Sequence, residues 1–132
     1  MTLRLATLLI FTLLSGCAAL PEAQIKLIGA RQLEFVAHSR SGPVVVFENG
    51  LGGRMEWWSK VLPAIASNTS YFAYNRPGYG KSAPTETPRD GAHVVEELRA
   101  ALLNQGMQPP YVLVGHSLGG LYMQVFARKH PQ

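Results

Sequence analysis

The stretch from residue 111 to residue 127 constrains the fold of this chain more than any other part of the sequence. Four apolar residues, Tyr-Val-Leu-Val at 111–114, are followed at once by Gly115-His116-Ser117-Leu118-Gly119. An apolar segment with helical spacing, 121–127, comes next. This order predicts a buried strand, a sharp turn and a helix.

The residue types of this Gly-x-Ser-x-Gly turn suit nucleophilic catalysis. Gly115 and Gly119 carry no Cβ atom, so strand and helix can approach closely while Ser117 takes a strained conformation with its Oγ exposed. The first amides of the helix face the same point, where the Leu118 N–H can stabilise an oxyanion. An ordinary strand–helix turn is the alternative, and the flanking strand and helix favour the catalytic interpretation.

The segments before this turn alternate between strand and helix patterns. Residues 32–39 alternate in polarity, which predicts a half-exposed strand near one edge of a sheet, and Val-Val-Val-Phe at 44–47 is typical of a buried central strand. Residues 56–66 have helical spacing with Pro63 as a kink or early stop, and 70–74 read as another strand. A further helix starts at Thr87 or Asp90 and runs to about Asn104. The order predicts an α/β fold, a parallel sheet with helices on both faces.

Another glycine-rich segment carries a resemblance to a known family. Residues 75–82, Asn-Arg-Pro-Gly-Tyr-Gly-Lys-Ser, resemble the Asp-Arg-Pro-Gly-x-Gly-x-Ser turn of the α/β-hydrolases. With the Gly-x-Ser-x-Gly turn, this makes the chain similar, from about Gln32 to its last residue, to the N-terminal half of an α/β-hydrolase. Asn75 stands where the family commonly has an Asp whose carboxylate often pairs with the neighbouring Arg. Arg76 therefore needs another acceptor for its hydrogen bonds.

The resemblance implies a serine hydrolase acting on ester, thioester or amide acyl groups. Ser117 would be the nucleophile. Epoxide hydrolases and haloalkane dehalogenases of the same fold use Asp at that position, so a serine there indicates ester, thioester or amide substrates. In the family, a His-Gly-x motif after the first central strand provides the second oxyanion donor. Asn49-Gly50-Leu51 takes its place here, so we assign that donor to the Leu51 N–H. A flexible connecting turn is the alternative interpretation of that segment.

The catalytic triad implied by the family is incomplete in this sequence. The family order is Ser, then Asp or Glu, then His, yet no Asp or Glu follows Ser117. His116 flanks the nucleophile, and a helical rise of about 1.5 Å per residue places His130 roughly 20 Å from it. We therefore expect a truncated domain, with its C-terminal strands missing and near-inactive as this chain.

Two alternatives remain open at this stage. The chain could be a non-catalytic, lipid-anchored binding remnant of the fold, or a partner chain could complete the sheet and supply the base. The missing strands would also leave an apolar sheet edge open to self-association.

The first 17 residues resemble the signal of a bacterial lipoprotein. Arg4 precedes the apolar run 5–14, which is too short to span a bilayer as a permanent helix. Leu14-Ser15-Gly16-Cys17 resembles a lipobox, and Cys17 is the only cysteine. An ordinary signal peptide with a chance cysteine is the alternative. The resemblance implies a lipidated Cys17 in the bacterial cell envelope, and Ala18 favours the outer membrane over the inner.

These patterns divide the 132 residues into a signal peptide (1–16), a tether (17–31) and a truncated α/β-hydrolase domain (32–132). The net charge of +4 is scattered and contains no Lys/Arg run, so no nucleic-acid partner is expected. No His/Cys/Asp cluster has ligand spacing, so neither a metal nor another cofactor is expected. The expected partners are a small acyl substrate and the membrane, through Cys17.

Overall fold

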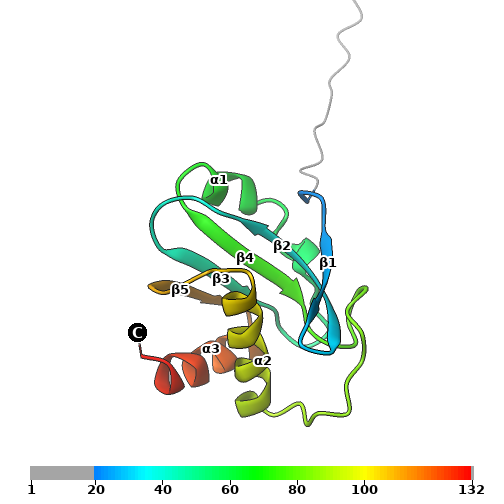
Figure 1. Cartoon of the computed structure of the whole chain (residues 1–132). Helices are drawn as coiled ribbons and strands as arrows, with labels where there is room; N and C mark the ends of the chain where they lie inside the picture. Colours follow the sequence, from blue (N-terminus) through cyan, green and yellow to red (C-terminus); the bar gives the residue numbers. More distant parts are fainter. Residues whose placement is uncertain (1–19, 132) are drawn as a thin grey trace, which may run out of the picture.

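One mixed sheet of five strands forms the centre of the computed structural model, which describes residues 20–131 (Figure 1). The strands lie in the order β1-β2-β4-β3-β5. Their bounds are β1 (Gln24–Ile28), β2 (Arg31–His38), β3 (Val44–Glu48), β4 (Ser70–Asn75) and β5 (Tyr111–Gly115). The helical elements are a 3-10 turn η1 (Met55–Trp58) and the helices α1 (Leu62–Ala66), α2 (Gly91–Asn104) and α3 (Leu118–Lys129). The expected signal peptide and Cys17 lie outside the described residues.

The sheet is parallel only in its second half. β3 pairs in parallel with β4 and β5, as predicted, whereas β2 pairs antiparallel with both β1 and β4. The prediction of a parallel sheet is therefore wrong for β1 and β2. The reason is the short connections: two residues, Gly29 and Ala30, join β1 to β2, and residues 39–43 join β2 to β3. Neither is long enough for the crossover that parallel strands need, so β2 runs opposite to β1 and to the β3–β4 pair.

β1 also corrects two expectations about the start of the chain. Residues 24–28 belong to the sheet, although we expected a tether as far as residue 31. β2 lies next to the edge strand β1, so its predicted place near one edge is confirmed, but it is not half-exposed, because its residues 33–36 are buried. The edge strands are β1 and β5, and Val112 of β5 is 47% exposed.

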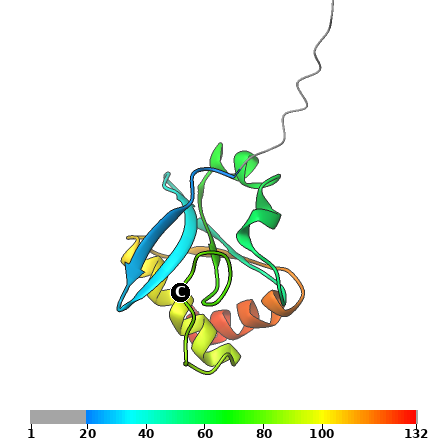
Figure 2. The ribbon, with the colours of Figure 1, turned by 90° about the vertical axis from the view of Figure 1, so that its right-hand side faces the viewer.

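Helices lie on both faces of the sheet (Figure 2), and an apolar cluster packs against each face. On one face, α2 and α3 pack through residues such as Leu98 and Phe126 against Phe72. On the other face, η1 and α1 pack through Met55 and Leu62. The α/β architecture with helices on both faces is therefore confirmed.

Capping and proline positions explain where the helices begin. The predicted helix 56–66 is divided into the two elements η1 and α1. Pro63 does not kink a longer helix but lies in the first turn of α1, where no backbone carbonyl would accept from its missing N–H. Asp90, not Thr87, caps α2, and its side chain accepts a 3.0 Å hydrogen bond from the His93 N–H. Within residues 20–131, no helix has the length and apolar character needed to cross a bilayer.

Candidate active site

Ser117 lies at a strained turn between β5 and α3, and we call residues 115–119 the elbow. Its φ of 53° and ψ of −122° make it the one non-glycine residue with positive φ among residues 20–131. Such a conformation costs about 1–3 kcal/mol, and the surrounding structure must hold it. Hydrogen bonds on either side do so: the His116 N–H donates to the Glu48 carbonyl at 3.0 Å, and the Gly119 N–H donates to the His116 carbonyl at 2.9 Å. The strained conformation predicted for Ser117 is confirmed.

Close backbone packing explains the glycines of the elbow. A Cβ atom on Gly115 would lie 2.6 Å from the carbonyl carbon of Gly119. A Cβ atom on Gly119 would meet the carbonyl oxygens of Glu48 and Asn49, the second at 2.6 Å. The predicted close approach of strand and helix is thus confirmed, and α3 also packs against the end of β3.

The glycine-rich turn after β3, residues 49–53, lies against the elbow. A Cβ atom on Gly50 would be 2.9 Å from Nδ1 of His116 and 3.2 Å from Cβ of Ser117. Among the backbone hydrogen bonds that the turns, loops and helix caps of residues 20–131 form, none has the Leu51 N–H or the Leu118 N–H as its donor. The fold therefore brings the two segments that carry the predicted oxyanion donors together at Ser117.

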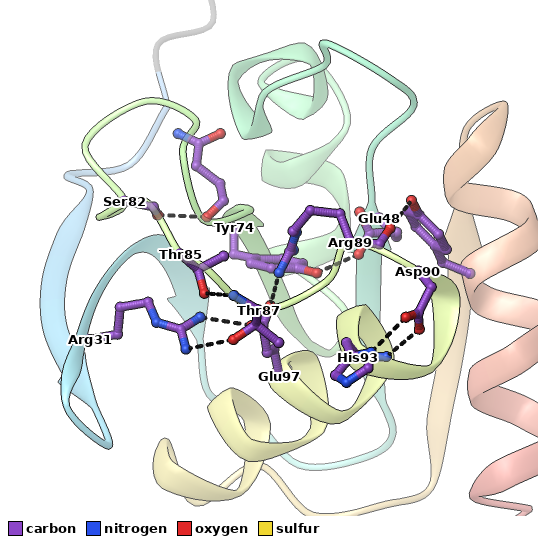
Figure 3. Close-up of polar contacts among 12 residues, drawn as sticks. Arg31, Glu48, Tyr74, Ser82, Thr85, Thr87, Arg89, Asp90, His93 and Glu97 are labelled. Atoms are coloured by element: carbon purple, nitrogen blue, oxygen red, sulfur yellow. Dashed lines mark hydrogen bonds and ion pairs between the residues drawn. The ribbon is translucent and has the colours of Figure 1, made fainter.

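Arg76 finds its acceptors in the 49–53 turn and at the end of β3. Its guanidinium pairs with the Glu48 carboxylate and donates to the carbonyls of Asn49 and Gly50, both at 2.6 Å. The Tyr74 hydroxyl donates to the other carboxylate oxygen of Glu48 at 2.5 Å (Figure 3). Glu48 is 0% and Arg76 6% exposed, so this ion pair is buried and held by further hydrogen bonds.

Burial dominates the electrostatics of this pair. Desolvation raises the pKa of the Glu48 carboxyl, and the Arg76 guanidinium and the Tyr74 hydroxyl lower it in part. The pKa of the Tyr74 hydroxyl is raised well above its ordinary value by burial and by the Glu48 charge. The sequence offered one signal for Glu48, an acidic residue directly after four apolar strand residues, and sequence reasoning missed it.

Asn75 has a structural role that an aspartate could not fill. Its Oδ1 accepts from the Met55 N–H at 2.9 Å, and its Nδ2 donates to Oε2 of Glu34 at 2.8 Å. The same Glu34 oxygen accepts from the Lys81 N–H at 2.7 Å. Two carboxylates at positions 34 and 75 would repel, so the amide suits this buried network, which ties the 75–82 turn to β2.

Neither imidazole near α3 forms a hydrogen bond with Ser117 among the contacts of residues 20–131. The His116 ring packs edge-on against Trp57, with centroids 5.7 Å apart. The His130 ring packs against Phe126, and its Nε2 lies 3.3 Å from Oε1 of Glu96. The described residues also contain no group of three or more His, Cys, Asp or Glu that could hold a metal ion.

The two tryptophans divide between core and surface. Trp58 covers the sheet, with its ring 4.9 Å from that of Phe47. Trp57 is 59% exposed and lies beside the elbow.

Comparisons with known proteins agree with this geometry. A family model described as alpha/beta hydrolase fold matches residues 43–132. The protein YqjL of Bacillus subtilis is 34% identical over 90 residues, which cover 68% of this chain and 36% of YqjL. The chain therefore spans about a third of the length of that relative.

Solved structures show the same fold at lower sequence identity. Cfl2 from Burkholderia cenocepacia superposes with a TM-score of 0.75 at 24% identity, covering 83% of this chain and 37% of Cfl2. Epoxide hydrolase A from Mycobacterium thermoresistibile gives a TM-score of 0.74 at 23% identity, covering 85% of this chain and 36% of the enzyme.

The two adjacent glycines of α3 provide a matched test of the packing at the elbow. Gly119→Ala should lower the free energy of unfolding by about 1–3 kcal/mol, because the new methyl group meets backbone atoms that cannot move aside. Gly120→Ala should raise it by up to about 1 kcal/mol, since its Cβ would have only a contact at 3.8 Å and alanine favours a helix. Urea unfolding measures both, and equal effects would contradict this packing.

The buried ion pair predicts a pH-dependent loss of stability. Arg76→Met should cost about 3–5 kcal/mol at neutral pH, because it leaves Glu48 buried without its cation. Removing the guanidinium raises the pKa of Glu48 further above its value in the parent chain, which burial already raises. Between these two pKa values the folded variant binds more protons than the folded parent chain. Stability of the variant should therefore fall, relative to the parent chain, as pH rises through that range, which lies above the ordinary carboxyl value of about 4.3.

Urea unfolding at about pH 5 and about pH 8 measures this difference, and Arg76→Met combined with Glu48→Gln is the control. The double variant has no ionisable group at position 48, so it should lose no stability relative to the parent chain as pH rises. A stability difference for the single variant that is the same at both pH values would contradict the assignment.

Proposed function

The chain belongs to the alpha/beta hydrolase fold family, and we propose that it carries the nucleophile of a serine hydrolase acting on ester, thioester or amide acyl groups. The observation that carries the proposal is the strained conformation of Ser117, with φ of 53°, at a strand–helix turn. A serine held at this cost, in a turn where glycine would be unstrained, is best explained by a need for its hydroxyl at that place.

The proposed chemistry assigns three groups to this chain. Oγ of Ser117 attacks the acyl carbonyl carbon while its proton passes to a general base. The tetrahedral intermediate then collapses: the bond from the acyl carbon to the alcohol, thiol or amine breaks, the base returns the proton to that leaving group, and the acyl group stays on Ser117 as an ester. The N–H groups of Leu51 and Leu118 stabilise the oxyanion of the tetrahedral intermediate. In comparable sites, each such donor lowers the activation free energy by about 3–4 kcal/mol. The hydrogen bonds of the described residues give Ser117 no imidazole base, so turnover requires one from another source.

We also propose that the protein is anchored to the bacterial cell envelope through a lipidated Cys17, with the outer membrane favoured over the inner. The sequence Leu14-Ser15-Gly16-Cys17 and the apolar run before it support this. Acyl chains contribute about 0.8 kcal/mol per buried CH₂, so two or more chains give stable anchoring.

A fluorophosphonate probe tests the nucleophile. We expect slow covalent labelling at Ser117, located by mass spectrometry of the digested chain, because the oxyanion donors alone retain part of the rate enhancement. Ser117→Ala should abolish the label, and Ser41→Ala, which removes an exposed serine in a turn, should leave it unchanged. A chain that folds and takes up no label would instead support a non-catalytic binding remnant.

Labelling with an alkyne palmitate in a bacterial host tests the anchor. The expressed chain should carry the label, and Cys17→Ser should lose it while Ser15→Ala keeps it. A label that survives Cys17→Ser, or none on the parent chain, would refute the anchor.

A further inference from the structure

Arg76 connects the end of β4 to the 49–53 turn in a specific way. Its two terminal guanidinium nitrogens donate to two successive carbonyls of that turn, those of Asn49 and Gly50. Both distances are 2.6 Å, which is short even for bonds from a charged donor. The planar fork of arginine suits two neighbouring acceptors, whereas the ammonium of lysine is a single point of charge.

Holding the Gly50 carbonyl also sets the direction of the next amide. The Gly50 carbonyl and the Leu51 N–H belong to one planar trans peptide, in which the two groups point in opposite directions. With the carbonyl turned toward Arg76 and also accepting from the Gly53 N–H at 3.2 Å, the Leu51 N–H must point away from the guanidinium. A cation on the carbonyl also polarises the peptide and strengthens its N–H as a donor.

Arg76 is itself held from several sides. The Glu48 carboxylate pairs with it, and the Tyr74 hydroxyl fixes that carboxylate from the other side. The rings of Tyr79 and Tyr122 lie 5.3 and 5.7 Å from its guanidinium carbon, and Tyr122 belongs to α3, the helix that begins at the elbow. The guanidinium is therefore fixed relative to both β3 and α3.

We propose that Arg76 is a positioning residue that fixes the Leu51 N–H in the direction an oxyanion donor needs, and that Glu48 fixes Arg76 for this purpose. The role rests on the proposed function, because it is useful only if Ser117 attacks an acyl carbonyl. A purely structural Arg76 would stabilise the fold without affecting one amide more than its neighbours.

The first experiment measures the Leu51 amide directly and needs no catalysis. In the ¹⁵N-labelled full chain, the Leu51 N–H should have an order parameter of about 0.85, as rigid backbone does. Arg76→Lys keeps the charge beside Glu48 and removes the fork, so the Leu51 value should fall below about 0.6 while that of Leu118 is unchanged.

The matched control is Arg31→Lys. It alters another arginine–glutamate pair, Arg31–Glu97 at 2.7 Å, which involves no residue of the 49–53 turn (Figure 3). It should leave the Leu51 amide unchanged. A folded Arg76→Lys chain with an equally rigid Leu51 amide would overturn the proposal. If that variant does not fold, Glu48→Gln decides: it weakens the hold on Arg76 and should lower the Leu51 order parameter in the same direction, and an unchanged value would overturn the proposal.

The second experiment follows the reaction of Ser117 with the fluorophosphonate. Arg76→Lys should lower the maximal rate of labelling about 10- to 1,000-fold, up to the loss seen when an oxyanion donor is removed, with the concentration for half-maximal rate unchanged. Arg31→Lys should keep the parent rate. If the parent chain takes up no label, the proposed function fails, and the amide measurement still decides whether Arg76 positions Leu51. A labelled parent chain with equal rates in both lysine variants would refute the catalytic purpose of the contact.

Discussion

The buried ion pair between Glu48 and Arg76 is the interaction on which the rest of the site depends. Glu48 ends β3, the strand that pairs with both β4 and β5, and its backbone carbonyl accepts from the elbow at His116. Its side chain holds Arg76, which in turn holds two carbonyls of the 49–53 turn. One residue thereby places both segments that meet at Ser117, and because the pair is buried, loss of either partner is costly.

Close backbone packing provides the second constraint. Gly119 lies against the Glu48 and Asn49 carbonyls, and Gly50 lies against His116 and Ser117, so no side chain separates the turn from the elbow. The strain at Ser117 is tolerated because β5, α3 and the end of β3 fix the backbone on both sides. The family match over residues 43–132 covers this whole arrangement.

Sequence patterns predicted the elements near the site better than the edge of the sheet. The central strand, the elbow and the strain at Ser117 followed from local signals: an apolar run, two glycines and a helical repeat. The pairing of β1 with β2 was missed, because Gln24–Ile28 is short and its Ile25 and Leu27 stay exposed, so this strand gains its order from pairing with β2 and not from burying an apolar face. The acceptors of Arg76 were missed as well, since Glu48 lies 28 positions away and only the fold brings the two together.

The central claim is that the Leu51 and Leu118 amides face the oxygen that develops negative charge when Ser117 reacts. A crystal structure of the chain phosphonylated at Ser117 tests it most directly. The account predicts a phosphonyl oxygen about 2.7–3.1 Å from both amide nitrogens, with the Gly50 carbonyl still turned toward Arg76. A phosphonyl oxygen directed into solvent, with either amide turned away from it, would contradict the account.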